Sequence, residues 1–199
     1  MHPILMAKSI PQEVLDEINA CLPILETGGL IVYPTDTVWG IGCDATNAEA
    51  VRKVYALKNR EDSKALICLV AHQAMLERHV HEVPEPAYDI MDLSTKPTTI
   101  IYDRPKNVAP NLIAADDSLA IRVASDRFCQ YLIRRFGRPI VSTSANISGE
   151  PTPPQYASIS PKILGGVDYV VNLHRETVRT APSSIIKLGN DGTVRVIRE

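Results

Sequence analysis

The sequence predicts an α/β (α+β) fold: one domain built on a twisted, mixed β-sheet with flanking helices. Short apolar runs rich in β-branched residues are interspersed with amphipathic helical patterns along the chain, which favours a sheet covered by helices. Hydrophobic residues make up 45% of the 199 residues, enough for a sizeable core. The sequence has no internal repeats, long linkers or low-complexity segments. We therefore expect a single domain over residues 1–199, with its core over about 10–199.

The first half of the chain predicts helices and strands in turn. Gly28 is suited to end a helix and Asn47 to begin one, and apolar residues at helical spacing precede the first and follow the second. The expected elements are a helix over Ile10–Glu26, a strand over Leu30–Tyr33, a helix from Asn47 to Lys58, a strand over Leu66–Val70 and a short helix over Gln73–Arg78.

The second half begins with a proline-containing segment, Val83–Pro86, and ends with a turn-like Gly-Asn-Asp-Gly sequence that predicts a β-hairpin. The expected elements between and including these are a strand over Thr98–Tyr102, a strand over Leu119–Val123, a helix over Asp126–Phe136, a strand over Pro139–Val141, a helix over Gln155–Leu164 that Pro161 breaks, a strand over Val167–Leu173, and hairpin strands over Ser184–Leu188 and Thr193–Ile197.

Charge and cysteine content narrow the function classes. The formal net charge is -2, so nucleic-acid binding would need a local basic cleft and not a basic surface. The four cysteines are scattered without a C-x-x-C pair, which favours core thiols of a reduced, cytoplasmic protein over disulfides or a zinc site. The sequence has no evident signal peptide and no apolar stretch near the ~20 residues that span a membrane.

The first candidate site follows the strand Leu30–Tyr33. Pro34 has no N–H for a sheet ladder, so the strand is expected to break there, just where Thr35, Asp36 and Thr37 arrive. Hydroxyls at the end of a buried strand suit ligand binding in α/β proteins.

The second candidate site is a basic segment at the end of the second helix. Lys58 and Arg60 are two residues apart, so they converge on one anion only if the helix end opens into a turn. A lysine point charge and an arginine fork suit a polyphosphate, and Lys64 follows in the same loop. A solvated basic loop is the alternative.

The third candidate site is the polar run Ser142–Asn146, which follows a short apolar strand and suits phosphate oxygens or a small polar substrate; an ordinary turn or helix cap is the alternative. Arg122 lies inside an apolar strand, where it either faces solvent or must find a partner or a cavity. Ser184 and Arg198 begin and end the terminal hairpin, where solvent exposure is the simpler expectation for the arginine.

The sequence lacks the familiar catalytic motifs. It has no phosphate loop, no G-x-G-x-x-G, no H-E-x-x-H, no G-x-S-x-G and no assignable catalytic triad. An enzyme of this sequence would therefore act by positioning and electrostatics without a covalent intermediate.

Taken in order, the motifs resemble the YrdC/Sua5/YciO family over essentially the whole chain. The resemblance rests on GGLIVYPTDTVWGIGCDA, ALKNREDSKALICLV, KPTTII, LAIRVAS, PIVSTSANISGEPTP and PSSIIKL followed by VRVIRE. It implies a twisted mixed sheet around a large basic cavity. The chain resembles the single-domain members, so the C-terminal extension of longer Sua5 proteins is not expected.

The resemblance also implies an activity. Members make L-threonylcarbamoyladenylate from L-threonine, bicarbonate and ATP, with release of pyrophosphate, and partner transferase proteins pass the threonylcarbamoyl group to tRNA. Mg²⁺ is expected to accompany ATP. The alternatives are a non-catalytic, YciO-like factor that binds double-stranded RNA or tRNA and acts in translation, and a nucleotide-binding protein with another acyl-transfer substrate.

By position, the resemblance assigns roles to individual residues. Lys58 and Arg60 are the expected catalytic pair at the ATP phosphates. Asp36 is not expected to act as a base, because the implied reaction gives it no proton to take. The threonine-binding residues are expected to be Thr35, Thr37, Arg122, Ser144 and Ser184, and the nucleotide-binding residues Lys58, Arg60, Lys64, Thr99, Asn146 and Arg198.

Overall fold

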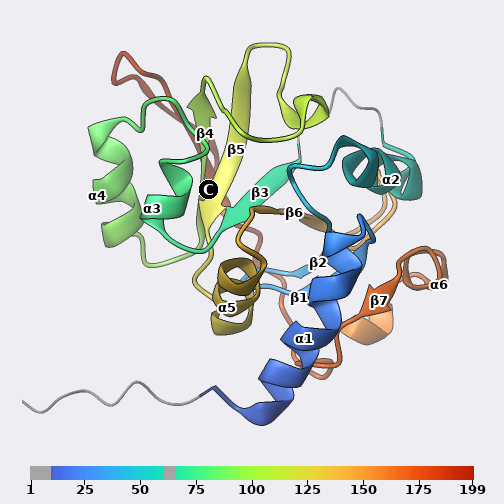
Figure 1. Cartoon of the computed structure of the whole chain (residues 1–199). Helices are drawn as coiled ribbons and strands as arrows, with labels where there is room; N and C mark the ends of the chain where they lie inside the picture. Colours follow the sequence, from blue (N-terminus) through green and yellow to red (C-terminus); the bar gives the residue numbers. More distant parts are fainter. Residues whose placement is uncertain (1–9, 61–65) are drawn as a thin grey trace, which may run out of the picture.

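The computed structural model describes residues 10–60 and 66–199, and its strands form one mixed, twisted sheet (Figure 1). The strand order within these residues is β7-β1-β2-β6-β3-β5-β4-β8-β9. The strands are β1 (Ile31–Pro34), β2 (Trp39–Gly42), β3 (Ile67–Val70), β4 (Thr98–Asp103), β5 (Ser118–Val123), β6 (Ile140–Ser144), β7 (Tyr169–Val170), β8 (Ser184–Leu188) and β9 (Val194–Arg198).

Parallel and antiparallel pairs mix in this sheet, as the sequence predicts. β3 runs parallel to β5, β4 to β8, and β1 to β7, whereas the remaining neighbours are antiparallel. The predicted α/β fold class is therefore confirmed.

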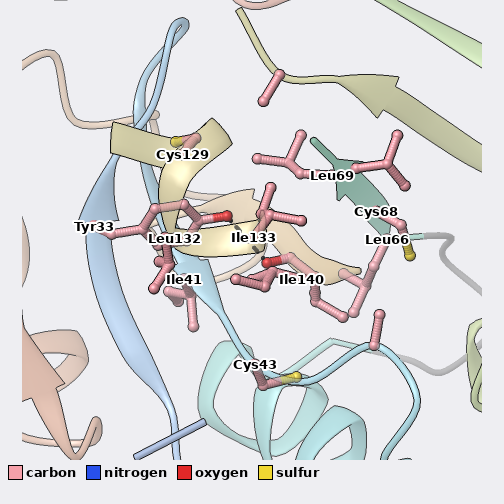
Figure 2. Close-up of a cluster of buried hydrophobic side chains, with 14 of the residues drawn as sticks. Tyr33, Ile41, Cys43, Leu66, Cys68, Leu69, Cys129, Leu132, Ile133 and Ile140 are labelled. Atoms are coloured by element: carbon pink, nitrogen blue, oxygen red, sulfur yellow. Dashed lines mark hydrogen bonds between the residues drawn. The ribbon is translucent and has the colours of Figure 1, made fainter. Parts of the chain in front are cut away.

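Helices pack against the sheet through their apolar faces, as the amphipathic patterns in the sequence predict. The α-helices are α1 (Gln12–Glu26), α2 (Ala48–Lys58), α3 (Gln73–Leu76), α4 (Glu85–Leu93), α5 (Arg127–Phe136) and α6 (Pro161–Leu164). α1 and α5 lie side by side (Figure 1). In Figure 2, Leu132 and Ile133 of α5 pack close to Ile41, Leu69 and Ile140 of the strands. All four cysteines are free and buried, so the expectation of core thiols is confirmed.

Two segments near the first candidate site differ from the prediction. Trp39–Gly42, where no strand is expected from the sequence, is strand β2 and forms a hairpin with β1, in which Pro34 pairs with Trp39. Pro34 is tolerated because β7 pairs only with Ile31 and Val32, so no neighbour on that side needs its missing N–H. The expected strand over Val167–Leu173 shrinks to Tyr169–Val170.

Two other differences come from prolines. α4 was not expected from the segment Val83–Pro86, yet Pro84 caps this helix and Pro86 occupies its first turn, where the missing N–H has no helical partner anyway. The helix expected over Gln155–Leu164 splits into a single 3₁₀ turn (Tyr156–Ser158) and α6, with Pro161 at the start of α6. The predicted break at Pro161 is thus confirmed.

A glycine in β2 leads to the first prediction. A Cβ atom at Gly42 would lie 2.6 Å from Tyr33 Cε1 and 3.0 Å from the Val141 carbonyl oxygen, and the Tyr33 hydroxyl donates to that same carbonyl. Because the ring is held at both ends, we expect Gly42→Ala to lower the free energy of unfolding by about 1–3 kcal/mol, measured by urea denaturation. Gly40→Ala is the control: its nearest contact would be 3.3 Å, so an equal loss there would contradict this explanation.

Candidate active site: a basic cavity over the sheet

A cavity of about 400 Å³ lies over one side of the sheet. Alternation along β5 shows how the sheet builds it: Leu119 and Ile121 join the hydrophobic core, while Ala120 and Arg122 line the cavity. Among the described residues that line it, three are arginines (Arg60, Arg122 and Arg198) and none is Asp or Glu. The predicted basic cavity is therefore present in a chain whose net charge is -2. Such a wall favours anions.

Hydroxyls form the rest of the polar lining, and an apolar wall faces them. The hydroxyl-bearing residues are Thr35, Thr37, Ser142, Thr143, Ser144, Thr152, Thr180 and Ser183. The apolar side chains include Leu66, Ile67, Ile101, Ile185 and Ile197. A site with an apolar wall and a few convergent polar groups suits a substrate with both an apolar and an anionic part.

The end of α2 places Arg60 in the cavity. Asn47 begins the helix as predicted, since its side chain accepts hydrogen bonds from the N–H groups of Glu49 and Ala50. Asn59 then adopts a left-handed conformation with φ 50°, and the chain leaves the helix before Arg60. Partial burial lowers the pKa of the Arg60 guanidinium from its ordinary value, with a weaker opposing effect from Tyr55.

Lys58 lies beneath the cavity and is not among the residues that line it. Its side chain is 1% exposed, and its ammonium donates to the backbone carbonyls of Ser144 and Asn146, the latter at 2.6 Å. Desolvation, and secondly the charge of Arg60, lower the pKa of Lys58 to about 8. A contact with phosphate would require the ammonium to leave both carbonyls, so that role stays a prediction.

The burial of Lys58 leads to a prediction about stability and pH. Between pH 8 and 10.5 the unfolded chain holds a proton on this lysine that the folded chain has released. The free energy of unfolding should therefore rise with pH across this window, by up to about 1.4 kcal/mol per pH unit. Urea denaturation at several pH values should show that the free energy of unfolding of wild type, relative to that of Lys58→Met, rises by about 1–3 kcal/mol from pH 8 to 10.5.

Lys53, exposed on the same helix, provides the matched control for this experiment, as Lys53→Met. A difference between wild type and Lys58→Met that stays flat from pH 8 to 10.5 would contradict the lowered pKa.

Thr35, Asp36 and Thr37 form a turn whose side chains bond to one another and to Arg122. Thr35 Oγ1 lies 3.0 Å from Thr37 Oγ1 and donates to the Val38 carbonyl. Arg122 Nη2 donates to Asp36 Oδ1 at 2.8 Å and contacts Thr37 Oγ1 at 3.4 Å. Arg122 Nε is buried and, among the described residues, has no hydrogen-bond partner. Arg122 was expected either to have a partner or to face a cavity, and it does both: it pairs with Asp36 and lines the cavity.

Ser144 and Asn146 differ in their place relative to the cavity. Ser144 ends β6 and lines the cavity, whereas Asn146 does not. The Asn146 amide donates to the carbonyls of Ile147 and Glu150, so its side chain stabilises the turn after β6.

The terminal hairpin brings Arg198 to the wall of the cavity, and Ser183, not Ser184, lines the cavity beside it. Ser183 lines the cavity, and its hydroxyl lies 2.8 Å from Thr99 Oγ1. The Arg198 guanidinium donates to the Ser183 carbonyl at 2.7 and 2.9 Å. Thr99 is fully buried behind Ser183, and neither Thr99 nor Ser184 lines the cavity.

Other residues at the site were not predicted. Arg179 donates to the Thr35 carbonyl, and Thr152 and Thr180 complete the wall. These three lie in irregular segments, where sequence periodicity gives no signal. Lys64 lies outside the described residues.

Within residues 10–60 and 66–199, no group of three or more His, Cys, Asp or Glu side chains is arranged to hold a metal ion. In the same residues, no helix is both long enough and apolar enough to cross a membrane.

Fold and cavity together define a class: an α/β protein with a basic cavity over a mixed sheet. The Sua5/YciO/YrdC family model, described as "Telomere recombination", matches residues 23–199, and the chain belongs to that family. A relative from Photobacterium profundum, "Threonylcarbamoyl-AMP synthase", is 35% identical over 140 residues, which cover 69% of this chain and 76% of the relative.

Solved structures share this fold, among them those of E. coli YciO and P. abyssi Sua5. The structure of E. coli YciO superposes with a TM-score of 0.81 at 26% identity and covers 96% of this chain and 91% of that one. The structure of P. abyssi Sua5 complexed with L-threonine superposes with a TM-score of 0.76 at 27% identity and covers 86% of this chain. Our chain spans 50% of that longer Sua5 chain.

Proposed function

We propose that this protein is an L-threonylcarbamoyladenylate synthase, a nucleotidyltransferase that condenses L-threonine, bicarbonate and ATP and releases pyrophosphate. The observation that carries the proposal is the 400 Å³ cavity with three arginines, a row of hydroxyls and no carboxylate in its described lining. Relatives named threonylcarbamoyl-AMP synthase, and a family structure complexed with L-threonine, support this substrate class over the RNA-binding alternative.

The proposed reaction needs no protein nucleophile. The threonine amine and bicarbonate form a carbamate with loss of water, and a carbamate oxygen attacks the α-phosphorus of ATP. The bond from that phosphorus to the bridging oxygen breaks, and pyrophosphate leaves. Negative charge builds on the phosphate oxygens, so the protein contributes by holding the reactants and stabilising that charge.

The cavity residues divide between the two ends of the substrates. Arg122 is assigned to the threonine carboxylate, because its buried Nε has no hydrogen-bond partner among the described residues, while its Nη2 contacts the hydroxyl of Thr37. Arg60 and Arg198 are assigned to the phosphates, with Ser144 and Ser183 as hydroxyl donors. Lys58 is assigned to the phosphates only if its ammonium leaves the carbonyls of the turn after β6.

Mg²⁺ is proposed to enter bound to the phosphates of ATP. The lining of the cavity supports this route, because a guanidinium cannot ligate a cation and the described lining holds no carboxylate to bind Mg²⁺ without the phosphates. When bound, the ion would neutralise charge on the phosphate oxygens.

We infer further that partner transferase proteins pass the threonylcarbamoyl group to tRNA. We place the protein in the cytoplasm, since four buried free thiols suit a reducing compartment. The test of the reaction is product identification: with ATP, L-threonine and ¹³C-labelled bicarbonate, the adenylate product should carry the label. A labelled product that contains no threonine would favour another acyl-transfer substrate.

A further inference from the structure

Asp36 lies directly behind the arginine that faces the cavity. Its side chain is 7% exposed and that of Arg122 is 4% exposed, so the two form a buried ion pair. Arg122 lines the cavity and Asp36 does not. The carboxylate therefore reaches a bound substrate only through Arg122.

Three donors converge on the two oxygens of this carboxylate. Arg122 Nη2 donates to Oδ1 at 2.8 Å. The backbone N–H and the hydroxyl of Ser125 donate to Oδ2 at 3.1 and 2.8 Å. Ser125 follows β5 by two residues, so the carboxylate joins the β1–β2 turn to the end of β5 and is fixed on both sides.

We propose that Asp36 is a positioning residue for the amino-acid substrate: it holds the Arg122 guanidinium so that its Nε edge is presented to the substrate carboxylate. This inference rests on the proposed function. A guanidinium is planar, so fixing Nη2 at Asp36 and Thr37 also fixes the direction of the remaining N–H groups. A donor held in its bound orientation loses less entropy when the ligand arrives.

The test substitution is Asp36→Asn, which keeps the size of the side chain. An amide has one acceptor oxygen and one NH₂ group. With its oxygen toward Arg122, asparagine sets the NH₂ group against the backbone N–H of Ser125, where only the Ser125 hydroxyl can turn to accept. With its oxygen toward Ser125, it sets the NH₂ group against the guanidinium. In the first arrangement residue 36 no longer accepts from the Ser125 N–H, and in the second the Arg122 guanidinium loses its acceptor.

The chain offers a closely matched control in Asp44. Its Oδ2 accepts from Arg138 Nη1 at 2.6 Å, and its Oδ1 accepts from the N–H and the hydroxyl of Thr46 at 2.8 and 2.7 Å. Asp44 is buried as well, but neither Asp44 nor Arg138 lines the cavity. Asp44→Asn thus repeats the same chemical change at a buried carboxylate that lies away from the cavity.

The experiment measures L-threonine binding by calorimetry and the KM values of pyrophosphate release, on the full chain. Asp36→Asn is expected to weaken threonine binding by about 10- to 100-fold while the KM for ATP stays unchanged. Asp44→Asn should change neither. In an Arg122→Lys background, Asp36→Asn should add less than about a twofold loss, because the carboxylate acts through the arginine.

Each outcome is decisive. Wild-type affinity in Asp36→Asn, or an equal loss in Asp44→Asn, would overturn the positioning role while leaving the proposed function intact. Fully additive losses in the double variant would overturn it too. Wild-type protein that binds no threonine would overturn the proposed function and this inference with it.

Discussion

Replacement of Arg122 by lysine should reduce kcat/KM for L-threonine by about 100-fold, mostly through KM. Lysine keeps the positive charge, and so spares the cost of leaving Asp36 buried without a partner, but it lacks the planar fork that serves Asp36 and the substrate together. The measurement is steady-state pyrophosphate release with threonine varied at saturating ATP and bicarbonate.

The control for this prediction is Arg138→Lys, at the other Arg–Asp pair with a buried carboxylate. It should leave kcat/KM unchanged. Arg122→Lys with wild-type kinetics would remove the carboxylate-binding role from β5.

Replacement of Arg60 by glutamine should lower kcat by about 100- to 1,000-fold, as when one preorganised donor to a developing charge is removed. Arg60 lines the cavity just beyond the left-handed turn at Asn59, and glutamine preserves much of its length without the charge. The KM for threonine should change little, since Arg122 and Thr37 lie at the other end of the proposed substrate.

Arg52→Gln is the matched control for Arg60→Gln. Arg52 lies on α2, the helix that precedes Arg60, where it pairs with Glu49 on the exposed surface. If Arg60→Gln retained wild-type kcat, or lost only affinity for threonine, the assignment of this residue to the phosphates would be wrong.

Much of the fold is readable from the sequence because local signals and tertiary packing agree. Gly28 and Asn47 mark helix ends that the structure reproduces, and the terminal hairpin follows its turn sequence. β2 was missed because Gly40 and Gly42 weaken the strand pattern, yet both lie where a neighbouring chain segment approaches closely.

The sequence predicts which kinds of residue form the candidate site, but not how deeply each of them is buried. The sequence shows that Lys58 and Arg60 are close, but only the tertiary structure shows one beneath the cavity and the other in its wall. Ser183 rather than Ser184 lines the cavity because side chains alternate between the two faces at the start of β8. The local sequence does not determine which of the two serines faces the cavity. Arg179 is joined to Thr35 across 144 positions of the chain, a contact without any local signal.

The central claim is that this cavity joins an amino acid to ATP, and omission of single substrates tests it most directly. Purified, folded protein with ATP and Mg²⁺ should release pyrophosphate only when L-threonine and bicarbonate are both present. Release that is unaffected by omitting either substrate, or no release from folded protein with all of them present, would contradict the proposed synthase activity.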